Sequence, residues 1–226
     1  CPARRSSGLV NNAYANGPIC VRARASLATG QFVHQNGYWD NAHPYEGRVK
    51  GWGHRLIEEG HCVESIGKLH YRDEADADGF SKHIVPLNVV NGTGDVMASI
   101  RENPPVRLGS RSGILNAGSG TSTYLEYDVD IANRAVDWLK QIEQNDSDGK
   151  PWVLFVSFVC PHPPYVAPPE LFDLYPLESI EMPVQSASSD WPDHPAFAEY
   201  RRVMEWEKPF SEEEIRNVTA AYYGCC

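Results

Sequence analysis

The sequence predicts an α/β fold in which a mixed, largely parallel sheet is flanked by helices. Three observations lead to this prediction. The run Trp152–Phe158 (WVLFVSF) is continuously apolar, which is typical of a strand buried on both faces of a parallel sheet. Residues 129–142 repeat apolar side chains at helical spacing just before that run. A second apolar segment, Cys62–Leu69, follows a helical pattern, and strands that alternate with helices indicate an α/β architecture.

Two short helices and one strand are predicted in the first third of the chain. The helices cover Ala23–Thr29 and Trp52–Glu59, because a glycine follows each of them, at Gly30 and Gly60. Glycine commonly ends helices, since it adopts the left-handed conformation without a steric penalty. The predicted strand Cys62–Leu69 begins almost directly after the second helix.

Two long segments lack a regular pattern. Residues 79–123 are rich in Gly, Pro, Asn and Ser, so we expect a long excursion over the surface with short local elements. Residues 168–209 contain many prolines and are also expected to be irregular. Because the chain carries no internal repeat, we treat residues 1–226 as a single domain.

The second half of the chain is predicted to hold two longer helices. The first covers 129–142. Its apolar residues on one helical face, expected to point inward, are Ile131, Ala135, Leu139 and Ile142. Polar residues 144–150 then turn the chain into the apolar strand. The second helix begins at Ser211–Glu214, which has the capping-box pattern Ser-x-x-Glu, and ends at Gly224. Its expected inward residues are Ile215, Val218 and Tyr222.

Composition limits the partners that the protein can have. The chain has 226 residues, with Lys+Arg 20 against Asp+Glu 30 and a formal net charge of -10. This charge argues against a nucleic-acid partner, but it allows a local cationic pocket for a small anion. The longest apolar run, Trp152–Cys160, is far shorter than the ~20 residues that a membrane-spanning helix needs. We therefore expect no membrane partner, and an oligomer is compatible with the sequence.

Six cysteines are spread along the chain without compact spacing. They are too sparse for a small disulfide scaffold, and no Cys and His residues fall at zinc-ligand spacing. This pattern favours reduced cysteines and a cytoplasmic protein.

The first candidate functional residues are Cys20 and Arg24. Cys20 lies at the predicted start of a helix, where unpaired backbone N–H groups and the helix dipole favour an anion. Arg24 follows four residues later and shares its helical face, so it can reach the same ligand. The spacing alone is also compatible with a buried cysteine beside a surface arginine.

Two further candidate positions follow predicted strands. Lys68 and His70 are two residues apart, so on a strand both side chains would project to one face. They would lie at its carboxyl end, where ligands bind in open α/β sheets. His162 lies on a proline-stiffened loop, Pro161–Pro164, which follows the other strand. The plain alternative for Lys68 and His70 is a solvated edge pair. The plain alternative for His162 is an ordinary loop histidine. We expect all of these side chains to converge with Cys20 in one cleft.

Together these motifs resemble the sulfatase family of the alkaline-phosphatase superfamily. The family signature, Cys-x-Pro/Ala-x-Arg followed by Ala-Ser-Leu-x-Thr-Gly, matches residues 20–30 (CVRARASLATG) except at Arg22. Residues 67–70 (GKLH) resemble the family's Gly-Lys-x-His segment, and residues 161–163 (PHP) resemble its Pro-His-x-Pro loop. Residues 39–45 (WDNAHPY) are similar to the choline-sulfatase, arylsulfatase and phosphonate monoester hydrolase branch. The resemblance implies an alkaline-phosphatase-like fold.

The resemblance also implies roles for individual residues. Cys20 would be oxidised to formylglycine, whose hydrate is the nucleophile and also a metal ligand. Arg24 would steady that hydrate, and Asn41 would contact it. The substrate, a small-molecule sulfate monoester, is an anion with a poor leaving group, so its site needs cations and a proton donor. Lys68 and His70 would bind the sulfate oxygens.

His162 would protonate the leaving alcohol. The implied cofactor is a divalent cation, first of all calcium, with magnesium or manganese as alternatives. The family binds it through an N-terminal Asp pair and a later Asp-Asn or Asp-His pair, and neither is visible in residues 1–226. We therefore expect a partial N-terminal catalytic domain that is incomplete at both ends.

Arg22 stands where the family's formylglycine-generating maturation enzyme expects Pro or Ala. The segment Cys1–Arg5 also fits Cys-x-Ala-x-Arg, but it lacks the second half of the signature, and we attribute that match to chance. The expected function is sulfuric ester hydrolysis. The alternatives are a phosphonate monoester or phosphodiester hydrolase, and a non-catalytic anion-binding remnant, which Arg22 and the missing metal segments would explain.

Overall fold

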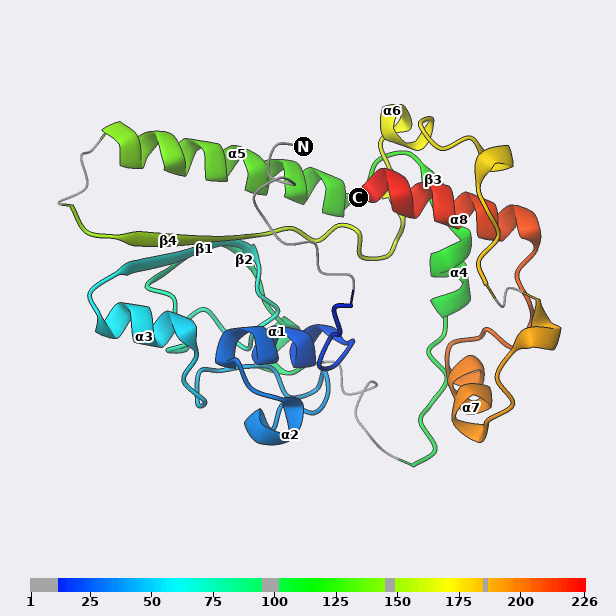
Figure 1. The fold of residues 1–226 in the computed structure, drawn as a ribbon, viewed down its shortest axis with the longest axis horizontal. Coiled ribbons are helices and arrows are strands. Elements are labelled where there is room, and N and C mark those ends of the chain that lie inside the picture. Colours follow the sequence, from blue (N-terminus) through cyan, green and yellow to red (C-terminus); the bar gives the residue numbers. More distant parts are fainter. Residues whose placement is uncertain (1–11, 95–101, 145–148, 185–186) are drawn as a thin grey trace.

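The structure, a computed structural model, describes residues 12–94, 102–144, 149–184 and 187–226. Its larger sheet has three strands in the order β2-β1-β4 (Figure 1). They are β1 (Cys62–Lys68), β2 (Lys82–Leu87) and β4 (Trp152–Ser157), and both pairings are parallel. The predicted α/β class, with a parallel sheet flanked by helices, is confirmed.

Helices cover both faces of this sheet. The long helix α5 (Thr123–Gln144) lies on one face, whereas α1 (Cys20–Thr29), α2 (Val33–Asn36) and α3 (Trp52–Glu58) lie on the other side (Figure 1). Each interface has its own apolar cluster. The cluster under α5 contains Ile66, Ile131 and Trp138. The cluster around α1 contains Val21, Ala25, Ala28, Tyr38, Tyr45, Leu69 and Tyr71.

The remaining elements gather beside the carboxyl end of β4. They are α4 (Ser110–Leu115), β3 (Gly118–Ser119), β5 (Val166–Ala167), α6 (Pro169–Phe172), α7 (Pro195–Val203) and α8 (Glu212–Cys225) (Figure 1). Among the described residues, short 3-10 helices cover Val90–Gly92, Leu177–Ser179 and Ser188–Asp190. Strands β3 and β5 form a second parallel pair. The capping box of α8 is confirmed, since the Ser211 hydroxyl accepts a hydrogen bond from Glu214 N (3.2 Å) and the Glu214 carboxylate accepts one from Ser211 N (2.7 Å).

Both segments that were expected to be irregular contain regular structure. The segment 79–123 includes β2, which pairs with Glu64–Ile66 and Lys68 of β1 across a register shift. Pro86 lies inside β2, but the strand is at the edge of the described sheet, where a missing N–H is tolerated. The segment 168–209 includes α7, where Pro195 occupies the first turn. Proline there starts a helix rather than breaking one.

Three burial predictions are wrong. Trp152 and Phe158 are 41% and 46% exposed, because β4 is an edge strand of the described sheet and β1 is the central one. Leu139 is 47% exposed, and the inward position on that part of α5 belongs to Trp138. Tyr222 is 42% exposed, whereas Ala220, Ala221 and Gly224 form the buried stripe of α8.

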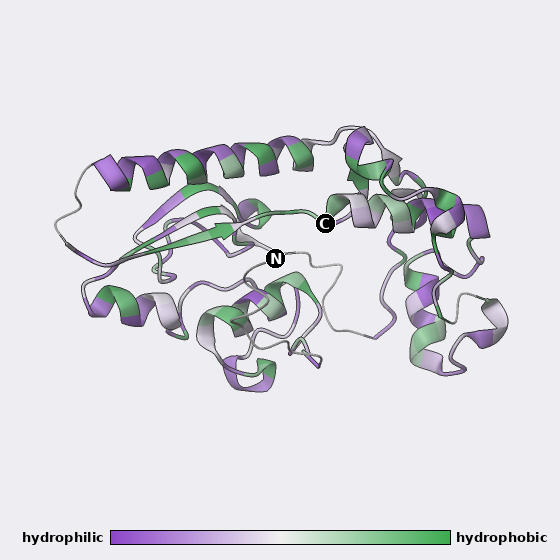
Figure 2. Ribbon diagram, turned by 45° about the horizontal axis from the view of Figure 1, so that its top comes forward, coloured by the Kyte–Doolittle hydropathy of each residue, from purple (hydrophilic) through white to green (hydrophobic). Residues whose placement is uncertain are grey.

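Figure 2 shows that α5 alternates between polar and apolar residues, whereas β4 is mostly apolar. A surface helix with one apolar stripe fits this pattern. Among the described residues, no helix has the length and apolar character needed to cross a membrane.

Candidate active site

Cys20 lies at the start of α1, as expected, although the helix begins three residues before the predicted Ala23. The residue before it, Ile19, has an extended backbone, so the helix begins abruptly at the cysteine. The Asn41 side-chain oxygen accepts a hydrogen bond from Val21 N (3.0 Å), one of the N–H groups that a helix start leaves without an internal partner. Asn41 therefore anchors the backbone next to Cys20.

Arg24 joins α1 to the carboxyl ends of two strands. Its Nη1 donates hydrogen bonds to the backbone oxygen of Lys68 (2.6 Å) and to the hydroxyl of Ser157 (3.1 Å). Lys68 ends β1 and Ser157 ends β4. Burial lowers the pKa of Arg24, and the Cys20 charge opposes this effect. The arginine thus holds Cys20 over the edge of the sheet where ligands bind in α/β folds.

Lys68 and His70 reach the site by a route that differs from the prediction. β1 ends at Lys68, and His70 lies beyond it with a positive φ of 57°. The two side chains therefore do not share one strand face. Lys68 is only 5% exposed, and burial lowers its pKa, with the charges of Cys20 and Asp128 acting in the opposite direction. His70 Nδ1 is buried without a hydrogen-bond partner among the described residues.

His162 lies on the loop after β4. Its Nδ1 donates a hydrogen bond to the backbone oxygen of Pro163 (2.7 Å), which leaves Nε2 as the nitrogen that can act on a ligand. Its ring lies edge-on to Tyr124 with a centroid distance of 5.9 Å. Asp128 of α5 fixes the start of the loop, because its two carboxylate oxygens accept hydrogen bonds from Val159 N (2.7 Å) and Cys160 N (2.8 Å).

The electrostatics of the site are those of an anion pocket. Hydrogen bonds from His162 and then His70, together with the positive charge of Lys68, lower the pKa of Cys20 to about 5, although burial acts in the opposite direction. The structure thus brings the six predicted residues together, since Cys20, Arg24, Asn41 and His162 line one pocket and the other two interact with the Cys20 thiol.

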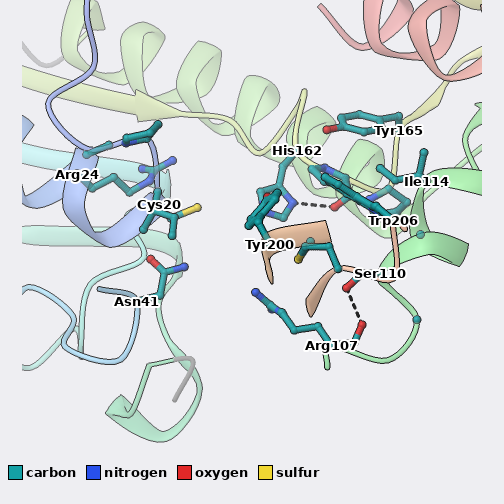
Figure 3. A pocket seen from close by; sticks show the side chains of 18 of the residues that line it. Cys20, Arg24, Asn41, Arg107, Ser110, Ile114, His162, Tyr165, Tyr200 and Trp206 are labelled. Atoms are coloured by element: carbon teal, nitrogen blue, oxygen red, sulfur yellow. Dashed lines mark hydrogen bonds between the residues drawn. The ribbon is translucent and has the colours of Figure 1, made fainter. Parts of the chain in front are cut away.

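The pocket has a volume of about 1110 Å³ and a second wall that the sequence did not indicate. Figure 3 shows Cys20, Arg24 and Asn41 on one side, and His162 with Tyr165, Tyr200 and Trp206 on the other.

Other functional residues were also missed. Asp128 is one of several polar residues on a surface helix, and no local pattern distinguishes it from the others. Ser157 could have been noticed, because it is the polar residue at the carboxyl end of the apolar strand.

The described residues do not fit a complete metal site. Among them, no group of three or more His, Cys, Asp or Glu side chains is placed to hold a metal ion. Instead, the groups around Cys20 are cationic or can become so. The second sequence match, Cys1–Arg5, lies outside the described residues.

Comparisons with known proteins agree with this geometry. A family model described as Sulfatase matches residues 3–179. The choline-sulfatase of Rhizobium meliloti is 33% identical over 189 residues, which cover 76% of this chain and 35% of the relative. Arylsulfatase K of Gallus gallus is 26% identical over 239 residues, which cover 99% of this chain and 41% of the relative. The chain thus spans well under half the length of the curated relatives it matches.

Two solved structures share the fold. The phosphonate monoester hydrolase of Agrobacterium radiobacter superposes with a TM-score of 0.61 at 17% identity, over 93% of this chain and 47% of that one. A protein solved in complex with its substrate D-glucosamine-2-N,6-O-disulfate gives a TM-score of 0.51, also at 17% identity, over 93% of this chain and 44% of that one.

Proposed function

Because the chain belongs to the sulfatase family, we propose that the complete protein hydrolyses sulfate monoesters and that Cys20 is the precursor of its nucleophile. The observation that carries the proposal is the cluster of His162, His70 and Lys68 around the Cys20 thiol at a helix start. A tetrahedral oxyanion beside Cys20 would meet donors and positive charge from three separate segments of the chain.

The chain's own residues have distinct tasks in this proposal. When Cys20 is oxidised to formylglycine by a maturation enzyme, the aldehyde hydrate supplies one hydroxyl for attack on sulfur and a second whose deprotonation expels sulfate. Lys68 and His70 bind the sulfate oxygens. Arg24 and Asn41 hold the first turn of α1 in place, through Lys68 O and Val21 N respectively.

His162 donates a proton to the departing alcohol oxygen. The hydrogen bond from its Nδ1 to Pro163 O orients the ring, so the proton transferred is the one that the imidazolium form carries on Nε2. Asp128 is a positioning residue, because it holds the backbone at 159–160 and touches no reacting atom.

The divalent cation, calcium by resemblance, is also part of the proposal. Among the described residues, Cys20 alone would contribute a ligand to this cation, as formylglycine. The remaining ligands would come from outside the residues that the structure describes. None of the steps above depends on it.

The test is the kinetics of the full-length protein, with formylglycine verified, on aryl sulfates of graded leaving-group acidity. We expect His162→Ala to lower kcat for phenyl sulfate by about 10²–10⁴. The loss should be much smaller for 4-nitrophenyl sulfate, whose leaving group needs no proton. His61→Ala, at the opposite end of β1, is the matched control and should change neither rate.

A paired phosphonate aryl ester separates the sulfatase from the phosphonate monoester hydrolase alternative. Faster turnover of the phosphonate would overturn the sulfate assignment. Binding of both esters without turnover by protein that carries formylglycine would support the anion-binding remnant instead.

A further inference from the structure

Two thiols outside the pocket at Cys20 lie together where the last turn of α8 meets the loop after β4. The side chains of Cys160 and Cys225 interact through a hydrogen bond, and both residues are half-buried and free in this structure. Neither of them lines the pocket at Cys20. A bond between them would join two segments that are far apart in the sequence.

Cys160 is held in place from the side of α5. Its backbone N–H donates a hydrogen bond to the Asp128 carboxylate (2.8 Å), and the neighbouring Val159 N does the same (2.7 Å). The Cys160 thiol also interacts with this carboxylate through a hydrogen bond. The position of the thiol is therefore fixed by its own loop and by a helix on the face of the sheet.

Cys225 is held in place from the other side, by the packing of α8 on β5. Its Sγ donates a hydrogen bond to the backbone oxygen of Val166 (3.4 Å). The preceding residue, Gly224, lies so close to β5 that an added Cβ would be 2.7 Å from Ala167 Cβ. Because a disulfide needs its two side chains already close and aimed at each other, two thiols fixed in contact are suited to form one.

We infer that Cys160 and Cys225 form a disulfide, and that this bond ties the loop that carries His162 to the end of α8. The inference does not depend on the proposed function, because neither thiol takes part in that chemistry. His162 lies two residues after Cys160, so the bond would hold its loop from the side of α8, in addition to the Asp128 contacts from α5.

The oxidant would be a small-molecule disulfide such as glutathione disulfide. The Cys225 sulfur, after losing its proton, attacks one sulfur of glutathione disulfide and releases one glutathione, which leaves a mixed disulfide at Cys225. The Cys160 sulfur, after losing its proton, then attacks the Cys225 sulfur and releases the second glutathione. The two cysteines lose two electrons and two protons, and one glutathione disulfide becomes two molecules of glutathione.

Both thiols ionise with difficulty, so the bond should form slowly and then persist. Burial, followed by the hydrogen bond with Asp128, raises the pKa of Cys160 to about 12. Burial also raises the pKa of Cys225, although the contact with Cys160 acts in the opposite direction. Easily reduced disulfides are those whose reduced form is stabilised, and these two thiols lack that stabilisation. We therefore expect a structural cross-link rather than a rapidly exchanging one.

The test is equilibration of the full 226-residue chain with glutathione buffers, followed by alkylation and peptide mass spectrometry without reduction. We expect a joined pair of peptides that contain Cys160 and Cys225, lighter by about 2 Da than the two separate peptides. The joined pair should persist when reduced glutathione is in excess, whereas the exposed Cys226 should be alkylated. Absence of the joined pair at every glutathione ratio would overturn the inference.

Single variants identify the partner of Cys160, because Cys225 and Cys226 lie in the same tryptic peptide. Cys225→Ser should abolish the joined pair, whereas Cys226→Ser should retain it. Cys62→Ser is the matched control and should also retain it, because Cys62 is another half-buried thiol and its hydrogen bond goes to Glu64 (3.6 Å). Loss of the joined pair in Cys226→Ser and its retention in Cys225→Ser would overturn the inference.

The stability of the parent chain is a second measurement, which does not depend on the folding of a variant. Closing residues 160–225 into a loop restricts the unfolded chain, so the oxidised form should melt roughly 5–15 °C above the reduced form. In Cys160→Ser the same two treatments should give equal Tm values. An oxidised parent chain that contains the joined pair but melts no higher than the reduced form would overturn the inference, because the folded structure would then have to distort to accommodate the bond.

Discussion

The Cys20 thiol is unusually acidic, and its reactivity should show this directly. Hydrogen bonds from His162 and His70 lower its pKa to about 5, so the thiolate is present above that pH and is lost below it. We expect its alkylation rate by iodoacetamide to be flat above about pH 6 and to fall with a midpoint near pH 5. Ordinary thiols show a midpoint of about 8.5.

Peptide-level mass spectrometry would follow the alkylation of each cysteine. Cys62 is the internal control, because burial raises its pKa and its reaction should need a higher pH than that of Cys20. His162→Ala removes the largest cause of the shift and should move the Cys20 midpoint upward. A Cys20 midpoint above pH 8 in the parent chain would contradict the geometry.

Arg22 should determine whether Cys20 is converted to formylglycine. Proline at this position presets φ in an extended chain, and Arg22 supplies neither that restraint nor the small side chain of alanine. We expect Cys20 to stay largely a thiol in the expressed chain, with little or no turnover of sulfate esters by that fraction. The tryptic peptide 6–22 would become lighter by about 18 Da if formylglycine formed.

Arg22→Pro is the informative variant. Arg22 lies in the first turn of α1, whose N–H groups have no acceptor within the helix, so the folded structure should tolerate proline there. Conversion in Arg22→Pro but not in the parent would confirm the prediction, and a dominant formylglycine peak in the parent would contradict it.

At the level of elements, Asp128 links α5 to the loop that carries His162. Asp128→Ala leaves Val159 N and Cys160 N without their acceptor and should lower the free energy of unfolding by about 2 kcal/mol or more. Because the loop is then less fixed, the alkylation midpoint of Cys20 should also rise. Asp130→Ala removes only an exposed pair with Arg134 and should cost less than about 1 kcal/mol in urea unfolding. Equal effects of the two variants would refute this role for Asp128.

Gly67 of β1 lies directly against β4 and α5. Its φ is +96°, and an added Cβ would lie 2.2 Å from Ser157 O and 2.6 Å from Ile131 Cδ1. We expect Gly67→Ala to lower the free energy of unfolding by about 2–5 kcal/mol, since strain and overpacking add.

Gly60→Ala separates the two causes. Gly60 also has a positive φ, of +85°, but nothing lies within 4 Å of its added Cβ. Only the backbone strain remains, so the loss in urea unfolding should be about 1–2 kcal/mol. A loss as large as that of Gly67→Ala would show that packing at Gly67 contributes nothing.

For the whole molecule, a net charge of -10 coexists with a cationic pocket, so binding of sulfate should be local and specific. At ten times its Kd, sulfate should stabilise the folded chain by about 1.4 kcal/mol. This corresponds to a rise in Tm of roughly 3–6 °C for a chain of this size.

The reference is potassium chloride at equal ionic strength. Lys68→Ala should abolish the extra rise in Tm, whereas Lys82→Ala, an exposed lysine on β2, should retain it. A rise that persists in Lys68→Ala would indicate general exclusion of sulfate from the protein surface rather than binding at the site.

Sequence patterns predicted those features that depend on neighbouring residues. The glycine after α1, the capping box of α8 and the apolar run of β4 are all local signals, and each element is present close to its predicted bounds. Five of the six candidate site residues were proposed because their motifs follow strand ends or a helix start, whereas Asn41 was proposed from the family resemblance of residues 39–45 alone.

The features that the sequence did not reveal depend on the tertiary structure. β2 contains Pro86 and lies in a glycine- and proline-rich segment, so only its pairing with β1 identifies it. No sequence pattern around Tyr200 and Trp206 indicates that their side chains line the pocket at Cys20. His70 leaves the line of the strand through a positive φ that nothing in the sequence around it requires.

The hydrogen bond between Arg24 and Ser157 has a consequence for the order of events during synthesis. It joins residues 133 positions apart, so α1 cannot reach its final place until β4 has emerged from the ribosome. At about 5–20 residues per second, this leaves Cys20 undocked for roughly 7–27 s. An enzyme that recognises the cysteine in an extended chain therefore has a defined interval in which to act. That interval ends when β4 pairs with β1.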